Sequence, residues 1–366
     1  MKRKASSLLL TAAFLLVVFC PHILWRAVSG QDEGENSEKR TLAERPAFSM
    51  EAIDAYPKAF EEYYNDHLPF RDLLIKLYNS MQYHVFRTSS NDDVILGKDG
   101  WLFYSSVIDG TSMQCYDGSL LFTDEELAQI ADHLTDTKKR LAEQGTEFVV
   151  FIAPSKARIY SEYMPDYLGE PAQMCMVNQV IAYLESHTDL TVVYPYEEMI
   201  AHKKAHPEQL LYYQTDTHWN DLGAYIGARA LLTALGIEIP SADQLDIMVQ
   251  APGRYDLAKL LTVWGIGDRG NTVVINSYPD QKLKTISNEF NGRMEFEMQD
   301  APDLRLFMHK DSFGSGMAPH LKYHLSRALL VHNIVYDAKE VWEEKPDVFV
   351  LEVTERYIRR LRNPVL

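Results

Sequence analysis

A carboxylate and an imidazole stand two residues apart in the segment Thr-Asp-Thr-His-Trp-Asn, at Asp216 and His218. A histidine works as a general base when a neighbouring carboxylate fixes its tautomer. Such a base can activate a serine hydroxyl by accepting its proton. The best candidate nucleophile is Ser312, which lies much later in the chain. These three residue types together predict acyl transfer through Ser-His-Asp chemistry.

Acyl transfer also needs donors for a developing oxyanion, and several residues are candidates. Asn220 follows the imidazole closely, and a glycine-rich sequence follows the serine. We predict a turn there, in which the backbone N–H groups of Phe313 and Gly314 face the oxyanion. Lys156 and Arg158 come directly after an apolar segment and are candidate substrate contacts.

Two other interpretations of these residues stay open. A serine in a glycine-rich segment is often only a turn residue. Asp216, His218, His309 and Asp311 have the side chains of a divalent metal site, although their spacing matches no known motif. The chain has no Cys-x-x-Cys and no His-Glu-x-x-His sequence. We favour the triad and predict neither a metal nor a cofactor.

The elements that must position these residues alternate between strands and helices. Continuous apolar runs predict strands that are buried on both faces, as in a parallel sheet. Helices between them predict an α/β domain with helices on both faces of the sheet. The expected strands are 148–153, 190–193, 304–308, 328–331 and 348–353, and the expected helices are 123–144, 175–187, 221–235 and 318–327.

The predicted sheet brings the candidate residues to one edge. In open α/β sheets, ligands bind at the carboxyl ends of the strands. Residues 154–158 follow one strand, residues 309–312 follow another, and the Asp-His pair follows the apolar run 210–213. Asn220 is suited to cap the helix 221–235, so the pair should lie on the loop that enters this helix. Pro319 suits the first turn of the helix 318–327.

The N-terminal part of the sequence predicts a membrane-associated segment rather than a sheet. Lys2, Arg3 and Lys4 precede the apolar run 8–24, which predicts a signal peptide or, as we favour, an uncleaved membrane anchor. We expect residues 1–30 to form this segment, 31–47 a polar linker, and 48–366 one extracytoplasmic domain. That domain should begin with helices and a hairpin at 94–104. A helical stripe should pack into the core: Phe70, Leu73, Leu74, Leu77, Met81 and Val85.

Charge and cysteine content narrow the functional classes further. The net charge of −16 argues against nucleic acid as a partner. Cys115 and Cys175 are the two cysteines outside the apolar run at the N-terminus. In an oxidising compartment they could form one disulfide, and the alternative is two buried free thiols.

Several segments, in the same order, resemble the alginate O-acetyltransferase family with an SGNH-hydrolase-like domain. The resemblance covers about residue 40 to the C-terminus. Its fairly specific parts are Thr-Asp-x-His-Trp at 215–219 and Asp-Ser-Phe at 311–313. Weaker parts are Gly-Lys-Asp-Gly-Trp-Leu-Phe at 97–103, Ala-Pro-Ser-Lys at 153–156 and Glu-Val-Thr-Glu-Arg at 352–356.

This resemblance implies a flavodoxin-like α/β/α sandwich and acetylation of an extracytoplasmic polysaccharide. It assigns Ser312 as nucleophile, His218 as base and Asp216 as the orienting carboxylate. The order differs from the usual SGNH pattern, in which the serine comes first, so the arrangement is permuted. The resemblance also implies that a membrane O-acyltransferase supplies the acetyl group. An acetyl-esterase and a non-catalytic polysaccharide-binding or assembly subunit remain alternatives.

Overall fold

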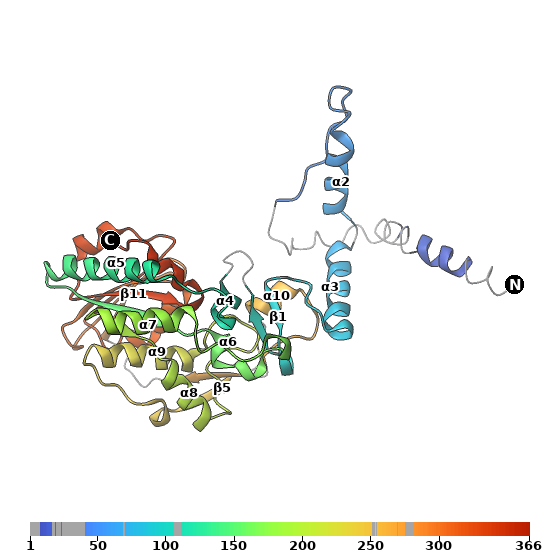
Figure 1. The fold of residues 1–366 in the computed structure, drawn as a ribbon. Helices are drawn as coiled ribbons and strands as arrows, with labels where there is room; N and C mark the ends of the chain where they lie inside the picture. Colours follow the sequence, from blue (N-terminus) through green and yellow to red (C-terminus); the bar gives the residue numbers. More distant parts are fainter. Residues whose placement is uncertain are drawn as a thin grey trace. The chain divides into compact units, whose positions relative to one another are not determined.

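The computed structural model describes residues 8–16, 19, 23, 41–68, 70–105, 111–250, 253, 255–268, 270–274 and 282–366. The chain divides into two compact units (Figure 1). One unit comprises residues 1–88 with 262–264, and the other comprises residues 89–261 with 265–366.

The described helices at 56–86 in the first unit correct one prediction. Helix α3 was expected to bury its apolar stripe, but the side chains of Leu73 and Leu77 are more than half exposed, at 52% and 55%. Among the described residues of the unit, no second layer covers this stripe. The elements are α2 (Tyr56–Asp66), α3 (Arg71–Met81) and the π-helical turn η1 (Gln82–Phe86).

The predicted membrane anchor is not supported. Residues 8–16 are helical, but much of the apolar run 8–24 lies outside the described residues, as do residues 31–40 of the predicted linker. Among the helices that the structure describes, none combines the length and the apolar character needed to span a bilayer.

The second unit is built on a seven-stranded mixed sheet, which confirms the α/β class. The five predicted strands form its parallel part, and two antiparallel strands that sequence analysis did not predict extend one edge. In sheet order the strands are β4 (Thr191–Val193), β3 (Glu147–Ala153), β11 (Val348–Thr354), β9 (Arg305–Lys310), β10 (Arg327–His332), β8 (Arg293–Met298) and β7 (Leu283–Asn288).

The strand order explains the permuted order of the candidate site residues. A flavodoxin-like sheet has the order 2-1-3-4-5. Counted along this chain, the parallel strands run 2-1-5-3-4. The strands can instead be numbered from β9, so that β9, β10, β11, β3 and β4 become strands 1 to 5. With this numbering the sheet order becomes 2-1-3-4-5. The strand order is therefore a circular permutation of the flavodoxin order. In the flavodoxin numbering, the segment after β9, which carries the candidate serine, comes before the segment after β4, which leads to the Asp-His pair.

Helices cover both faces of the sheet. Alternate residues of β3 point to opposite sides: Phe148 packs in a core with α5 and α7, whereas Phe151 packs in a core with α9 and α11. The predicted capping box is present, because Thr123 accepts from the N–H of Glu126 and the Glu126 carboxylate accepts in return. The helices are α5 (Asp124–Ala142), α7 (Met176–His187), α8 (Tyr196–Ala205), α9 (Asp221–Ala234), α11 (Ser312–Leu321) and α12 (Ala338–Glu344).

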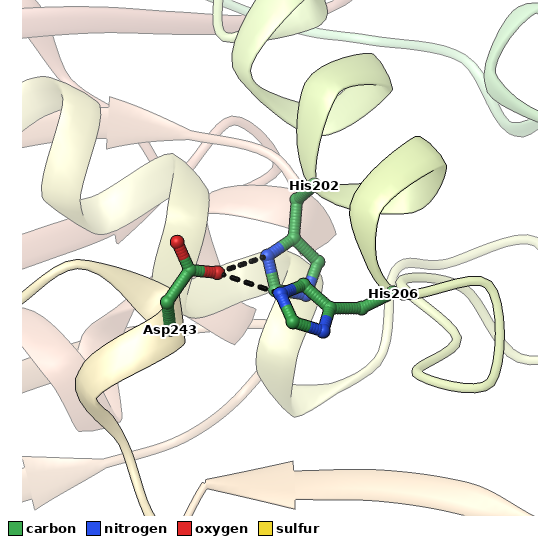
Figure 2. Close-up of side chains that lie close together, drawn as sticks. All are labelled: His202, His206 and Asp243. Atoms are coloured by element: carbon green, nitrogen blue, oxygen red, sulfur yellow. Dashed lines mark ion pairs between the residues drawn. The ribbon is translucent and has the colours of Figure 1, made fainter.

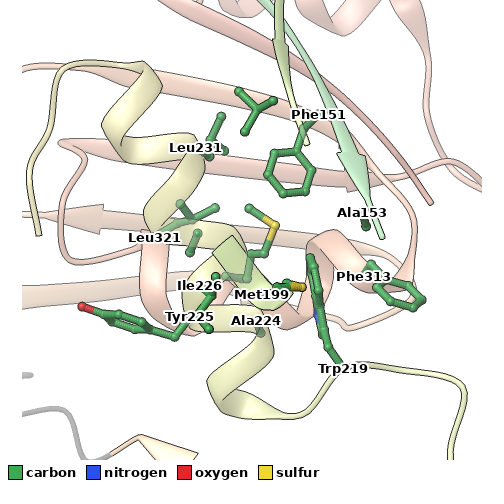
Figure 3. Close-up of a cluster of buried hydrophobic side chains, with 14 of the residues drawn as sticks. Phe151, Ala153, Met199, Trp219, Ala224, Tyr225, Ile226, Leu231, Phe313 and Leu321 are labelled. Atoms are coloured by element: carbon green, nitrogen blue, oxygen red, sulfur yellow. The ribbon is translucent and has the colours of Figure 1, made fainter. Parts of the chain in front are cut away.

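The core between the sheet and α9 ends at the candidate site. Figure 3 shows Trp219 and Phe313 at the end of this cluster of buried side chains, beyond Ala224 and Phe151. The Trp219 and Phe313 rings meet edge to face, with centroids 5.0 Å apart. Burying a large apolar side chain stabilises the fold by roughly 1.5–3 kcal/mol, so this packing fixes the residues next to both rings.

The remaining described elements connect this framework. The predicted hairpin is confirmed, and its turn places Asp99 and Gly100 at positive φ. A second antiparallel pair, β5 with β6, was not predicted. These elements are β1 (Val94–Leu96), η2 (Lys98–Gly100), β2 (Leu102–Tyr104), α4 (Ser112–Asp117), α6 (Lys156–Ile159), η3 (Ser161–Tyr163), η4 (Asp166–Leu168), η5 (Ala242–Gln244), β5 (Ile247–Gln250), α10 (Asp256–Leu261), β6 (Asn271–Val274) and η7 (Glu355–Arg362).

The last predicted helix is misplaced by six residues. It was expected at 318–327 after a glycine-rich turn, but α11 begins at Ser312 and contains Pro319 in its interior. The reason is the Asp311 side chain, which accepts a hydrogen bond from the N–H of Phe313 and caps the helix before any turn can form. The segment after Leu321 leads directly into β10.

Candidate active site

The structure brings Asp216, His218 and Ser312 into one hydrogen-bonded row. Asp216 Oδ1 lies 2.6 Å from His218 Nδ1, and His218 Nε2 lies 2.7 Å from Ser312 Oγ. A carboxylate only accepts, so Nδ1 carries the proton and Nε2 has a free lone pair. The lone pair can accept the serine proton. The two distances show that these three side chains lie as close together as predicted.

Buried Lys156 holds the loop that carries Asp216. Its ammonium donates to the carbonyls of Leu102, Gln214 and Asp216, at 2.5, 2.9 and 2.9 Å. Burial lowers the pKa of Lys156 to about 7, against the attraction of nearby carboxylates. All three N–H bonds of the ammonium are used by backbone carbonyls. The predicted substrate contact is thus a structural clamp in this conformation.

Asp268 supports the same loop through the loop's backbone N–H groups. Its two carboxylate oxygens accept from the N–H groups of Gln214 and Thr215, at 3.1 and 2.7 Å. Burial raises the pKa of Asp268, and its hydrogen bonds oppose this shift. The loop is therefore held by the buried cation Lys156, which was predicted as a substrate contact, and by the buried carboxylate of Asp268, which sequence analysis did not predict.

A second carboxylate, Asp256, lies beside the Asp-His pair and was not predicted. It accepts from the N–H and the hydroxyl of Thr217, at 3.0 and 2.8 Å, and its Oδ2 lies 3.8 Å from His218 Nδ1. Burial and the charge of Asp216 raise the pKa of Asp256. Burial alone would raise the pKa of Asp216 too, but hydrogen bonding to His218 and its charge lower it. Asp216 is therefore the ionised partner of the imidazole.

The serine is positioned at the first residue of α11, directly after β9. Asp311 fixes this point, because its Oδ1 caps α11 and its Oδ2 accepts from the N–H of Thr354 at 3.2 Å and from its hydroxyl at 2.5 Å. The Asp311 N–H in turn donates to Glu352 Oε2 at 2.7 Å. Burial and the Asp311 charge raise the pKa of Glu352 well above its usual range, so a proton is retained there.

The glycines after the serine serve close packing and not a turn. A Cβ at Gly314 would lie 2.7 Å from Lys310 Cβ, and a Cβ at Gly316 would lie 2.7 Å from Trp219 Nε1. Real Cβ atoms essentially never approach neighbours this closely. The small residues therefore let α11 approach β9 and Trp219, which immediately follows the candidate base.

The predicted oxyanion and substrate contacts have mixed outcomes. Asn220 is 1% exposed and uses its amide to cap α9 and to donate to the Leu210 carbonyl. Arg158 is buried and pairs with Glu355, 3.6 Å away. The N–H of Phe313 already donates to Asp311. Of these predicted groups, the N–H of Gly314 remains suitable, because first-turn N–H groups have no acceptor inside their helix.

The alternative metal site from four ligands does not assemble among the described residues. His309 stacks on Tyr336, with ring centroids 3.9 Å apart, and burial lowers its pKa to about 4. Asp311 is committed to Phe313 and Thr354. Neither residue belongs to a cluster of potential metal ligands with His218 in the described part of the chain.

A small pocket is lined in part by Thr217, the residue between Asp216 and His218, and includes the cation Arg356, to which sequence analysis gave no role. The guanidinium of Arg356 lies 5.4 Å from the Phe313 ring centroid and 5.3 Å from that of Tyr104. Its Nε is buried and has no hydrogen-bond partner among the described residues. The pocket is lined by Phe103, Tyr104, Ser112, Met113, Cys115, Ser155, Lys156, Ala157, Thr217 and Arg356.

Of the two alternatives for the cysteines, the disulfide is not formed. Cys115 and Cys175 are both buried and free. The thiol of Cys115 donates to the Glu355 carbonyl at 3.7 Å, and Arg158 donates to the Cys175 sulfur. Burial raises the pKa of Cys115. The alternative of two buried thiols therefore describes this structure.

Residues 94–263 match the family model described as SGNH hydrolase-like domain, acetyltransferase AlgX. This range contains Asp216 and His218 and stops before Ser312. The resemblance to this family, predicted from separate motifs, is confirmed.

Individual curated proteins are also similar to this chain. The chain is 28% identical over 209 residues to a probable alginate O-acetylase AlgJ of Pseudomonas putida, covering 56% of this chain and 51% of AlgJ. It is 25% identical over 213 residues to the AlgJ of Pseudomonas syringae pv. tomato, covering 56% of this chain and 50% of that protein. The chain thus spans about half the length of the curated relatives it matches.

A solved structure supports the fold. Bacillus cereus PatB1, solved with a sulfonyl adduct, aligns with a TM-score of 0.56 over 75% of this chain and 99% of that chain. Its sequence identity is 15%, so the likeness concerns the arrangement of the elements only.

Proposed function

We propose that this protein is an O-acetyltransferase that moves acetyl groups to hydroxyls of a polysaccharide through an acetyl-serine. The observation that carries the proposal is the row from Asp216 through His218 to Ser312, with contacts of 2.6 and 2.7 Å. The names of the AlgJ relatives support the choice of reaction and of a polysaccharide acceptor.

In the first half-reaction, Ser312 Oγ attacks the carbonyl carbon of an acetyl ester. His218 Nε2 takes the hydroxyl proton and then gives it to the departing alcohol, while Asp216 stabilises the imidazolium. The carbonyl oxygen gains negative charge as the new bond forms. The N–H groups of Ser312 and Gly314 at the start of α11 suit this charge, because they are unbonded within the helix and lie at its positive end.

In the second half-reaction, a sugar hydroxyl replaces the departed alcohol. His218 removes its proton, the hydroxyl oxygen attacks the acetyl carbon, and the bond to Ser312 breaks as the serine regains the proton. With water as the acceptor the same steps give an esterase. The acceptor therefore decides between the two activities, and the triad serves both.

We also propose an extracytoplasmic location and a separate donor. The basic residues before the apolar run 8–24 suit export. Acetyl-CoA is not expected outside the cytoplasm, so the acetyl ester must come from another protein. We expect a membrane O-acyltransferase in this role. A reporter that is active only outside the cytoplasm, fused after residue 40, should give signal, and a silent fusion would contradict export.

The test of the triad is a serine-to-alanine change. Ser312→Ala removes one oxygen and should lower release of nitrophenol from nitrophenyl acetate by about 10⁴-fold or more. Mass spectrometry should detect an acetyl group on the wild-type peptide that contains Ser312. Ser119→Ala, which changes an exposed serine away from the site, is the matched control and should keep full activity.

The alternatives predict different products. An acetyltransferase should acetylate an added oligosaccharide faster than it hydrolyses the ester, whereas an esterase should form only acetate. A non-catalytic binding subunit should retain polysaccharide in the Ser312→Ala protein and show no acetyl-serine in the wild type. Full activity of Ser312→Ala would reject the acetyl-serine mechanism.

A further inference from the structure

Two histidines and an aspartate form a cluster separate from the triad row. His202 lies near the end of α8, and His206 is the residue that directly follows this helix, where its N–H donates to the His202 carbonyl. Figure 2 shows both rings facing the carboxylate of Asp243 in η5. Asp243 Oδ1 lies 3.6 Å from His202 Nδ1 and 3.0 Å from His206 Nε2.

The hydrogen bond on the far side of His202 decides which nitrogen carries its proton. His202 Nε2 lies 3.0 Å from Gln209 Oε1, an oxygen that only accepts, so Nε2 is the donor. In the neutral ring, Nδ1 then presents a lone pair to the Asp243 carboxylate. Two acceptors face each other without a hydrogen between them.

We propose that His202 Nδ1, His206 Nε2 and Asp243 Oδ1 bind a divalent transition metal ion, with Zn²⁺ as the best fit. Zinc accepts imidazole and carboxylate ligands, and tetrahedral bonds of about 2.0–2.2 Å place ligand atoms about 3.3–3.6 Å apart. The three ligand atoms lie within 4.8 Å of one another, and the two contacts to Asp243 bracket the required spacing.

The surroundings have the features of a metal site. A ligating histidine usually donates its other N–H to an oxygen, as His202 does to Gln209. The His202 side chain is 5% exposed, while those of His206 and Asp243 are 32% and 65% exposed. One ligand is thus fixed in the protein and two border solvent. Solvent access provides an entry path and a water for the fourth position.

The ion would join two parts of the unit. It would tie the end of α8 to η5, which follows α9 in the chain. The segment that leaves His206 leads within ten residues to Asp216. We infer a structural ion that braces the segment before the triad, since none of its three ligands contacts Ser312 or His218.

The test measures metal binding by the full chain after chelator treatment and dialysis. Calorimetric titration with Zn²⁺ should give one equivalent, and the melting temperature should rise with Zn²⁺ concentration. Co²⁺ in place of Zn²⁺ should give the visible absorption of a tetrahedral site. Absence of stoichiometric binding would overturn the proposal. These readouts do not depend on acetyl transfer, so they succeed or fail independently of the proposed function.

Variants identify the ligands. Asp243→Asn and His206→Gln should each weaken Zn²⁺ binding at least tenfold. Asp246→Asn removes the same charge three residues away at an exposed position and should bind normally. Among the described residues, Asp216, His218 and Asp256 form the other cluster of potential metal ligands. His218→Ala removes a ligand from that cluster only, so this variant should still bind one equivalent of Zn²⁺. Binding that is lost in His218→Ala and retained in Asp243→Asn would place the ion at the triad and overturn the proposal.

Discussion

At the scale of single residues, the imidazole is governed by two carboxylates with different tasks. Asp216 contacts Nδ1 directly and also accepts the backbone N–H of His218 at 2.9 Å. Asp256 holds Thr217 and reaches the imidazole only at 3.8 Å. Asp216, which is bonded directly to the imidazole, fixes its tautomer. Asp256 fixes the backbone at Thr217, the residue between the aspartate and the histidine.

The first prediction separates these tasks. Asp256→Asn keeps an oxygen for the N–H of Thr217 and removes a charge near the imidazolium, so the rate with nitrophenyl acetate should fall about tenfold. In Asp216→Asn the same rate should fall about 10⁴-fold, because the wrong tautomer of the imidazole is then favoured. Steady-state kinetics measures both, with Asp246→Asn as the charge control. Equal losses for the two variants would reject the assignment of Asp216 as the orienting group.

The second prediction concerns the buried acid Glu352. Its pKa is raised in the folded protein by burial and by the charge of Asp311, so the folded state keeps a proton that the unfolded chain loses above about pH 4.3. The unfolded state then binds fewer protons, and stability falls as pH rises, by up to about 1.4 kcal/mol per pH unit for one group. The fall ends above the folded pKa.

Glu352→Gln should therefore flatten the dependence of stability on pH between pH 5 and 7. Gln keeps an oxygen that can accept the N–H of Asp311 and has no proton to release. Urea unfolding midpoints at pH 5, 6 and 7 measure the effect. Glu297→Gln, on the partly exposed neighbour of Lys284, should leave the slope as in the wild type. An unchanged slope in Glu352→Gln would contradict a retained proton.

At the scale of elements, the start of α11 determines where the nucleophile stands. Asp311 caps the helix and bonds Thr354 at the end of β11, so one side chain connects the serine to two strands. Asp311→Ala should lower stability by about 1–3 kcal/mol, because it removes a cap and leaves buried donors unpaired. It should also lower the rate of serine acylation, since Ser312 is the next residue.

Asp337→Ala is the matched control for this third prediction. Asp337 caps α12 in the same way, by accepting from the N–H of Lys339. Its loss should cost about 1 kcal/mol and leave acylation unchanged. Chemical denaturation and labelling with a serine-reactive probe measure the two effects. If both variants lose stability and neither loses labelling, Asp311 is only a cap and does not position the nucleophile.

At the scale of the whole molecule, the two compact units have unequal cores. Both large clusters of buried apolar side chains lie within residues 101–361, and the first unit buries few of its apolar residues. Removal of residues 1–88 should therefore leave the triad unit folded and active on a small ester. Circular dichroism and nitrophenyl acetate kinetics on residues 89–366 test this. Loss of the cooperative transition would show that the first unit is needed for folding.

Local pattern was enough to predict the strands and the Asp-His pair. The five parallel strands are mostly apolar segments, and Asp216 and His218 are close in sequence, so their proximity needs no long-range contact. The Thr123 capping box and the Asn220 cap are likewise local, because each involves residues three apart. Ser312 is distant in sequence, so its link to the pair rested on its place after a predicted strand and on the motif resemblance.

Tertiary structure decided the rest. Whether Lys156 faces substrate or three carbonyls depends on segments that meet only in the fold, near Leu102 and Gln214. The attachment of α11 to the end of β11 depends on Asp311 meeting Thr354, and the exposure of the α3 stripe depends on what packs against that helix. Periodicity reports which side of an element is apolar, but it does not report what lies against that side. Long-range pairing sets the burial, the pKa shifts and the hydrogen bonds that give this site its chemistry.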